Sequence, residues 1–180
     1  MGSVRRALWF DDQLVPSQER LLRRHIALLA REGVELVRAP NIATFARRLD
    51  EHWQEDTKTI SVDLLVLDLM VPQMRGVRDF RDLGLESTRL DEYTCGIQLA
   101  EILFGHVEPY PDHRSAWKNG RLCGLEKVPT CVLSTNEGGR QAFDRYRLPI
   151  DKDVQFFWKD APDDKLDSTL GAWVRKCAVS

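Results

Sequence analysis

The sequence predicts an α/β fold in which a parallel β-sheet carries helices on both faces. Apolar runs of strand length alternate with segments of helical periodicity along most of the chain. The run at 62–68 is almost continuously apolar, which is typical of a central parallel strand that is covered on both sides. No internal repeat or low-complexity segment interrupts this alternation. These observations favour one doubly wound sheet.

The expected elements follow from local signals. The strands are expected at 5–10, 34–39, 62–68, 129–134 and 154–158. The helices are expected at 17–32, 42–53, 96–104, 138–147 and 162–177. The apolar stripe of the first helix comprises Leu21, Leu22, Ile26 and Leu29. Asn41 is the expected N-cap of the second helix, and Pro162 suits the first turn of the last.

Five strands joined by helical crossovers predict a flavodoxin-like topology. Crossovers between parallel strands are right-handed, and the simplest doubly wound arrangement of five strands has the order 2-1-3-4-5. The alternation stalls at about 73–94 and again at 105–127, where the composition is polar or rich in Gly and Pro. We therefore expect one domain over 1–180 that carries two insertions, with no output domain. Loops of this length are candidates for a binding surface.

Composition excludes several classes of function. A formal net charge of −2 in 180 residues argues against a nucleic-acid-coating protein, which would carry a basic excess. No apolar stretch is long enough to span a membrane, so a cytoplasmic protein is expected. The chain has four cysteines, and reduced thiols are expected because a domain of this size does not need disulfides. Their spacing with the histidines matches no zinc motif.

Three aspartates follow two of the predicted strands. Asp11 and Asp12 close the run ALWFDD, and Asp68 follows the apolar part of LLVLDLMVP. Parallel strands bring such residues to the carboxyl edge of the sheet, where open α/β sheets bind their ligands. Mg²⁺ prefers oxygen ligands and retains several waters, so two or three carboxylates suffice to hold it. We expect Asp12 and Asp68 to be direct ligands, and Asp11 to bind directly or through water.

A hydroxyl and an ammonium are expected at the same edge. Ser134 ends the run TCVLS, and Lys159 follows VQFFW. Asp68 could attack a phosphoryl group as a nucleophile, while Ser134 and Lys159 contact the phosphoryl oxygens. Each feature alone has an ordinary explanation, because an Asp-Asp pair often forms a turn or a cap. Their joint order along the chain carries the functional interpretation.

At this point the chain resembles the receiver domain of two-component response regulators, apart from the two insertions. ALWFDD looks like the family's first strand and acidic pair, LLVLDLMVP like its phosphoacceptor strand, TCVLST like its fourth strand and FFWK like its fifth. The resemblance implies Mg²⁺ as cofactor, a histidine kinase or phosphotransfer protein as donor, and self-catalysed phosphorylation and dephosphorylation. It implies the following roles: Asp11 and Asp12 as metal-side acids, Asp68 as phosphoacceptor, Ser134 as switch hydroxyl, Lys159 as phosphate-contacting lysine and Phe156 as switch aromatic.

The chain departs from the family in two places near the site. A glycine normally begins the third helix soon after the phosphoacceptor strand, whereas here Gly96 is delayed by the first insertion. The residue after the lysine is normally proline, and here it is Asp160, which adds a negative charge. Restricted access to Asp68 and altered phosphoryl affinity are the expected consequences.

Three hypotheses remain at this stage. The leading one is a stand-alone receiver that is phosphorylated on Asp68 and signals by changing how it binds a protein partner. The second is a receiver-derived interaction module that works without phosphorylation, which the insertions and Asp160 favour. The third is an aspartate-based phosphohydrolase, but such enzymes place a second aspartate two positions after the nucleophile, where this chain has Met70.

Overall fold

A five-stranded sheet, parallel throughout, forms the centre of the molecule. The structure is a computed structural model that describes residues 4–71, 96, 99, 124, 125, 127–135, 140, 141, 143, 144 and 154–178. The strands of the sheet are β1 (Arg5–Phe10), β2 (Val34–Ala39), β5 (Leu64–Leu67), β6 (Thr130–Ser134) and β7 (Gln155–Trp158). Their spatial order is β2-β1-β5-β6-β7. Numbered along the chain within this sheet, that is 2-1-3-4-5, so the flavodoxin-like topology is confirmed.

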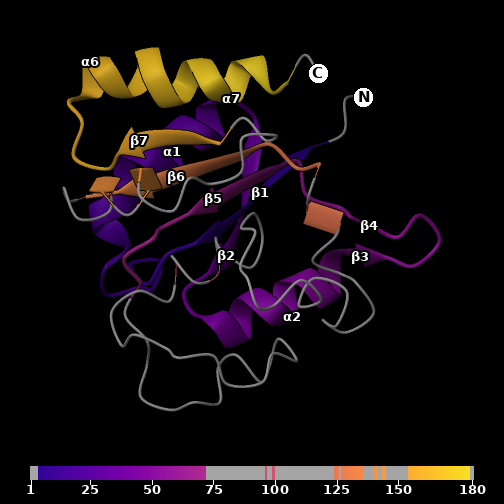
Figure 1. Ribbon diagram of the computed structural model, residues 1–180. Coiled ribbons are helices and arrows are strands. Elements are labelled where there is room, and N and C mark those ends of the chain that lie inside the picture. Colours follow the sequence, from indigo (N-terminus) through magenta and orange to yellow (C-terminus); the bar gives the residue numbers. More distant parts are fainter. Residues whose placement is uncertain are drawn as a thin grey trace.

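Helices cover both faces of the sheet (Figure 1). One face carries α2 (Ile42–His52), whereas α1 (Arg23–Arg31), α6 (Asp163–Leu166) and α7 (Ala172–Lys176) lie on the other. Alternate residues of β1 contribute to the two cores: Leu8 and Phe10 pack on the α2 side, and Ala7 and Trp9 on the α1 side. All four residues of β5 are buried, as expected for a central strand.

The second helix illustrates how local sequence sets an element. The Asn41 side chain accepts a hydrogen bond from the Thr44 backbone N–H at 2.8 Å, which satisfies one of the unpaired donors at the start of α2. The helix then buries Ile42, Phe45, Ala46 and Leu49 against the sheet. The cap was predicted from the sequence.

The first helix differs from its prediction. It opens with a 3₁₀ turn, η1 (Glu19–Leu22), before α1 begins. A 3₁₀ helix has three residues per turn, so the stripe expected from the 3.6-residue period does not hold there. Leu22 is buried as expected, but Leu21 is 56% exposed.

Other parts of the chain show further differences. A short antiparallel hairpin, β3 (Trp53–Gln54) and β4 (Thr59–Ile60), was not predicted. The last helix is interrupted by a π-helical turn, η3 (Asp167–Gly171), between α6 and α7. The described residues of the expected helices at 96–104 and 138–147 are helical. The insertion at 73–94 and residues 105–123 of the second insertion lie outside the described residues. No helix within the described ranges is both long and apolar enough to cross a membrane.

Candidate functional site

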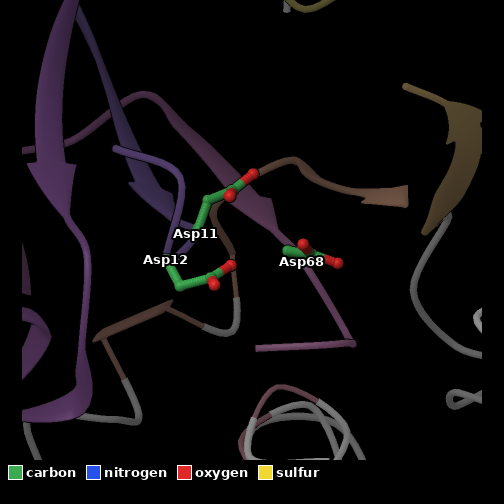
Figure 2. A group of neighbouring side chains, drawn as sticks. All are labelled: Asp11, Asp12 and Asp68. Carbon is green, nitrogen blue, oxygen red and sulfur yellow. The ribbon is translucent and has the colours of Figure 1, made fainter. Parts of the chain in front are cut away.

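The ends of β1 and β5 bring the three aspartates together. The backbone N–H of Asp68 donates to the carbonyl of Phe10 at 2.8 Å, and the N–H of Asp11 donates to the carbonyl of Ala39 at 3.1 Å. These bonds extend the sheet pairing by one residue beyond the strand ends. Figure 2 shows Asp11 and Asp12 at the end of β1 and Asp68 at the end of the neighbouring strand. One carboxylate oxygen from each of the three lies within 4.8 Å of the others.

Lys159 extends into this acidic cluster from the end of β7. Its ammonium lies 2.5 Å from Asp68 Oδ2 and 2.7 Å from Asp11 Oδ2. The lysine is only 4% exposed, and Asp11 and Asp68 are 0% and 4% exposed, so the contacts form away from bulk water. Its backbone N–H donates to the carbonyl of Ser134 at 2.9 Å, which ties β7 to the end of β6.

Asp11 is held by donors on both of its carboxylate oxygens. Trp9 lies on the same face of β1 two residues earlier, and its indole N–H donates to Asp11 Oδ2 at 3.2 Å. The backbone N–H of Gln13 donates to Oδ1 at 3.0 Å. Lys159 also contacts Oδ2. The Asp68 carboxylate is engaged in the same way, by Lys159 on Oδ2 and by the Met70 backbone N–H on Oδ1, so a cation would share carboxylate oxygens with these donors.

The electrostatics of the cluster favour an additional positive charge. Burial raises the pKa of Asp11 to about 6, with Asp68 adding to the shift and Lys159 opposing it. Burial and the charge of Asp68 also raise the pKa of Asp12. Burial alone would lower the pKa of Lys159, but the carboxylates of Asp68 and Asp11 outweigh it and raise that pKa. One ammonium therefore does not balance three carboxylates, and hard oxygen donors in this number fit a divalent cation such as Mg²⁺.

The strand order decides the fold. The order 2-1-3-4-5 in an all-parallel sheet, with helices on both faces, is that of flavodoxin and of response-regulator receivers. The chain has the flavodoxin-like fold, which receiver domains share. No family model matches this sequence, and no curated protein does either.

Several solved structures, receiver domains among them, are similar to the chain at low sequence identity. The N-terminal domain of a response regulator/sensory box/GGDEF protein from Carboxydothermus hydrogenoformans is 12% identical, with a TM-score of 0.48 over 97% of this chain and 98% of that one. The receiver domain of a sensor histidine kinase from Pseudomonas aeruginosa PAO1, solved with a magnesium ion, is 15% identical, with a TM-score of 0.46 over 96% and 99%. A yeast Spc42 coiled-coil segment fused to another structure is 12% identical, with a TM-score of 0.51 over 99% and 85%.

Asp68 lies against a glycine. The Asp68 carboxylate accepts a hydrogen bond from the Met70 backbone N–H at 3.0 Å. A Cβ atom on Gly96 would lie 1.9 Å from the Asp68 carbonyl oxygen and 2.7 Å from Leu69 Cα. Only a residue without a side chain fits this approach. The sequence showed Gly96 delayed by the insertion, and the fold nevertheless brings it to Asp68.

Ser134 and Phe156 occupy different environments. Ser134 is fully buried at the end of β6, and its Oγ has no hydrogen-bond partner among the described residues. An unpaired buried hydroxyl is uncommon and is available to a ligand. Phe156 is partly buried on β7, where its ring meets Phe143 and Trp158 at centroid distances of 5.3 and 5.1 Å. The guanidinium of Arg140 lies 5.1 Å from the same ring centroid.

Some polar contacts at the site were not anticipated from the sequence. Among them are the bond from Trp9 to Asp11 and a bond from the Arg24 guanidinium to the carbonyl of Lys159. The Trp9 contact could have been suspected, because residues two apart on a strand share a face. Arg24 lies 135 positions away from Lys159, and no local pattern indicates their contact. Asp160, the residue in place of the family's proline, is exposed.

Proposed function

We propose that this chain is a receiver-type phosphoacceptor, in which Asp68 accepts a phosphoryl group and the phosphorylated form binds a protein partner differently. The observation that carries the proposal is the position of Lys159. Its ammonium contacts Asp68 and Asp11 inside a cluster of three carboxylates at the carboxyl edge of the sheet. A fixed positive charge beside an acceptor carboxylate suits phosphoryl transfer, because it stabilises the charge on the transferring group.

The residues of this chain divide the chemistry between them. One carboxylate oxygen of Asp68 attacks the phosphorus atom of the donor, the bond from phosphorus to the donor breaks, and the donor leaves with that electron pair. Lys159 neutralises charge on the phosphoryl group, and the unpaired Ser134 hydroxyl donates a hydrogen bond to it. Asp12 and Asp68 would hold Mg²⁺, with Asp11 acting through water, and the bound ion would offset the charge repulsion between attacker and donor.

The donor and the downstream partner follow from the same proposal. A histidine kinase or a histidine-containing phosphotransfer protein supplies the phosphoryl group. The two segments that interrupt the sequence pattern, 73–94 and 105–127, are our candidates for the surface that contacts the downstream protein, because long insertions between core elements commonly carry function.

A second function remains in competition. Lys159 already pairs with two of the three carboxylates, and such a closed buried network can serve specificity of folding alone. The chain would then be an interaction module that works without phosphorylation. Under this alternative, the affinity for the partner does not depend on whether Asp68 is phosphorylated.

Intact mass spectrometry after incubation with acetyl phosphate and Mg²⁺ tests the first function. We expect one added phosphoryl group, which is absent in Asp68→Asn and in the presence of a chelator. Intrinsic tryptophan fluorescence with Mg²⁺ and beryllofluoride is read on the same sample, because the Trp9 indole donates to Asp11 and Trp158 precedes Lys159, so binding at the site is detected even when the small donor reacts slowly. Failure of both measurements would favour the phosphorylation-independent module.

A further inference from the structure

Arg24 connects three separate segments beside the site. It lies near the start of α1, and its Nη2 donates to the backbone carbonyl of Lys159 at 2.5 Å. Its Nη1 lies 3.2 Å from a carboxylate oxygen of Asp163, in the first turn of α6. A guanidinium can make both contacts because its donors form a rigid fork. Helix α1 is thereby joined to both sides of the turn between β7 and α6.

This contact bears on the position of the lysine ammonium. Lys159 is fixed on its N-terminal side by the bond from its N–H to the Ser134 carbonyl. On its C-terminal side the chain enters a turn, and Asp160 is exposed there. Four rotatable bonds separate the lysine ammonium from its backbone. The location of the ammonium therefore depends on how firmly the backbone is held. Arg24 holds the carbonyl end of that residue.

We propose that Arg24 is a positioning residue for Lys159, which keeps the ammonium against Asp68 and Asp11. This inference rests on the proposed phosphoacceptor function of the cluster. Arg24 touches neither Asp68 nor Asp11 through any hydrogen bond within the described ranges, so it acts through the lysine backbone. The side chain of Arg24 is 36% exposed, which leaves room for substitution without disturbing the core.

Loss of Arg24 has two effects of opposite sign. A less firmly held ammonium is a weaker partner for the incoming phosphoryl group, so labelling of Asp68 slows. The same ammonium repels a divalent cation and occupies oxygens of Asp68 and Asp11, so Mg²⁺ binds more tightly when Lys159 is loosened. A variant that merely loosened the fold would lose both properties together.

The experiment compares Arg24→Gln with Arg24→Lys and with Arg23→Gln, an exposed neighbour that matches the loss of charge. We expect Arg24→Gln to be labelled by acetyl phosphate roughly three- to tenfold more slowly, as for one charge-assisted hydrogen bond at a partly exposed position. We expect its Mg²⁺ dissociation constant, measured by calorimetry, to fall about twofold or more. Arg24→Lys keeps the charge but loses the forked pair of donors, so we expect intermediate values of the labelling rate and the Mg²⁺ dissociation constant. Arg23→Gln should have the values of the wild type.

A Lys159→Met background separates positioning from a general structural role. If Arg24 acts through Lys159, Arg24→Gln changes neither labelling nor Mg²⁺ affinity once the lysine is gone. Persistence of the effect in Lys159→Met would overturn the proposal. So would a parallel loss of labelling and Mg²⁺ affinity in Arg24→Gln.

A third measurement keeps this inference separate from the proposed function. The ammonium signal of Lys159 in ¹⁵N-lysine-labelled protein, assigned by its absence in Lys159→Met, needs neither metal nor phosphorylation. We expect this signal to broaden or exchange faster with water in Arg24→Gln, and an unchanged signal would refute positioning. If the wild type is not labelled but the Lys159 signal is perturbed in Arg24→Gln, the proposed phosphoacceptor function is rejected. The positioning role of Arg24 is then retained.

Discussion

Replacing Lys159 with methionine tests the electrostatics of the site most directly. The change removes the ammonium that lies 2.5 Å from Asp68 and 2.7 Å from Asp11, while a side chain of similar length remains. Three carboxylates with oxygens within 4.8 Å are then left without their cation. Removing one partner of a buried pair costs about 3–5 kcal/mol, a large part of the 5–15 kcal/mol that stabilises a typical domain.

The loss of stability depends on pH with a definite sign. In the wild type the pKa of Asp11 is about 6, above its ordinary value of 3.8, because burial outweighs the opposing effect of Lys159. Without Lys159 that pKa rises further. The folded variant therefore takes up a proton at a pH where the unfolded chain does not, so its stability increases as the pH falls through this range. The deficit should be largest at pH 8 and smaller at pH 5.5.

Urea unfolding measured by circular dichroism at pH 8 and pH 5.5, with and without Mg²⁺, checks this prediction. Mg²⁺ that binds only the folded state adds about 2.7 kcal/mol at one hundred times its dissociation constant. We expect it to restore much of the loss at pH 8. Lys165→Met is the matched control, because Lys165 is an exposed lysine on α6. A Lys159→Met variant as stable as the control at pH 8, or a deficit that does not change with pH, would refute the reasoning.

Three further predictions concern other positions. Gly96→Ala should lower the free energy of unfolding by about 1–3 kcal/mol and slow labelling of Asp68, because the added Cβ overlaps the Asp68 backbone. In the same urea titration Gly124→Ala should lower it less, because the nearest atoms to a Cβ at this position belong to side chains at 3.1 Å. His25 is fully buried with both ring nitrogens unpaired among the described residues, and burial lowers its pKa to about 4. The unfolded chain therefore takes up a proton below about pH 6.5 that the folded protein refuses, so stability should fall between pH 6.5 and 4 by up to about 3 kcal/mol. His25→Gln should remove this part of the pH profile, and an unchanged profile would contradict it. Asn41→Ala should lower the free energy of unfolding by about 1 kcal/mol, whereas Asn41→Asp, which keeps the capping oxygen, should not.

The extent to which the sequence predicted the site can be seen from its individual residues. Asp11, Asp12, Asp68, Ser134 and Lys159 each end or follow an apolar run, and parallel strands necessarily present those positions at one edge. Their proximity could therefore be predicted from the sequence. The individual contacts could not be predicted, because the order of the strands sets which strand ends are adjacent. The ammonium of Lys159 reaches Asp11 and Asp68 only when β7 is paired with β6 in the observed register.

Local sequence also determined most of the elements. The continuous apolar run of β5, the cap at Asn41 and the amphipathic stripe of α2 all depend on residues close together in the chain, so period and propensity suffice to predict them. The 3₁₀ turn that leaves Leu21 exposed and the hairpin of β3 and β4 did not follow from those patterns, because both are short and are stabilised by what packs around them.

Tertiary structure alone decided the contacts between residues far apart in the chain. Arg24 meets the carbonyl of Lys159 across 135 positions, and Gly96 approaches the Asp68 backbone despite an intervening insertion. Such contacts depend on how helices dock on the sheet, which is governed by the summed packing of two cores and not by any local pattern. The sequence by itself therefore determined the class of fold and which side chains reach the site, and the packing of the folded chain determined how those side chains are held.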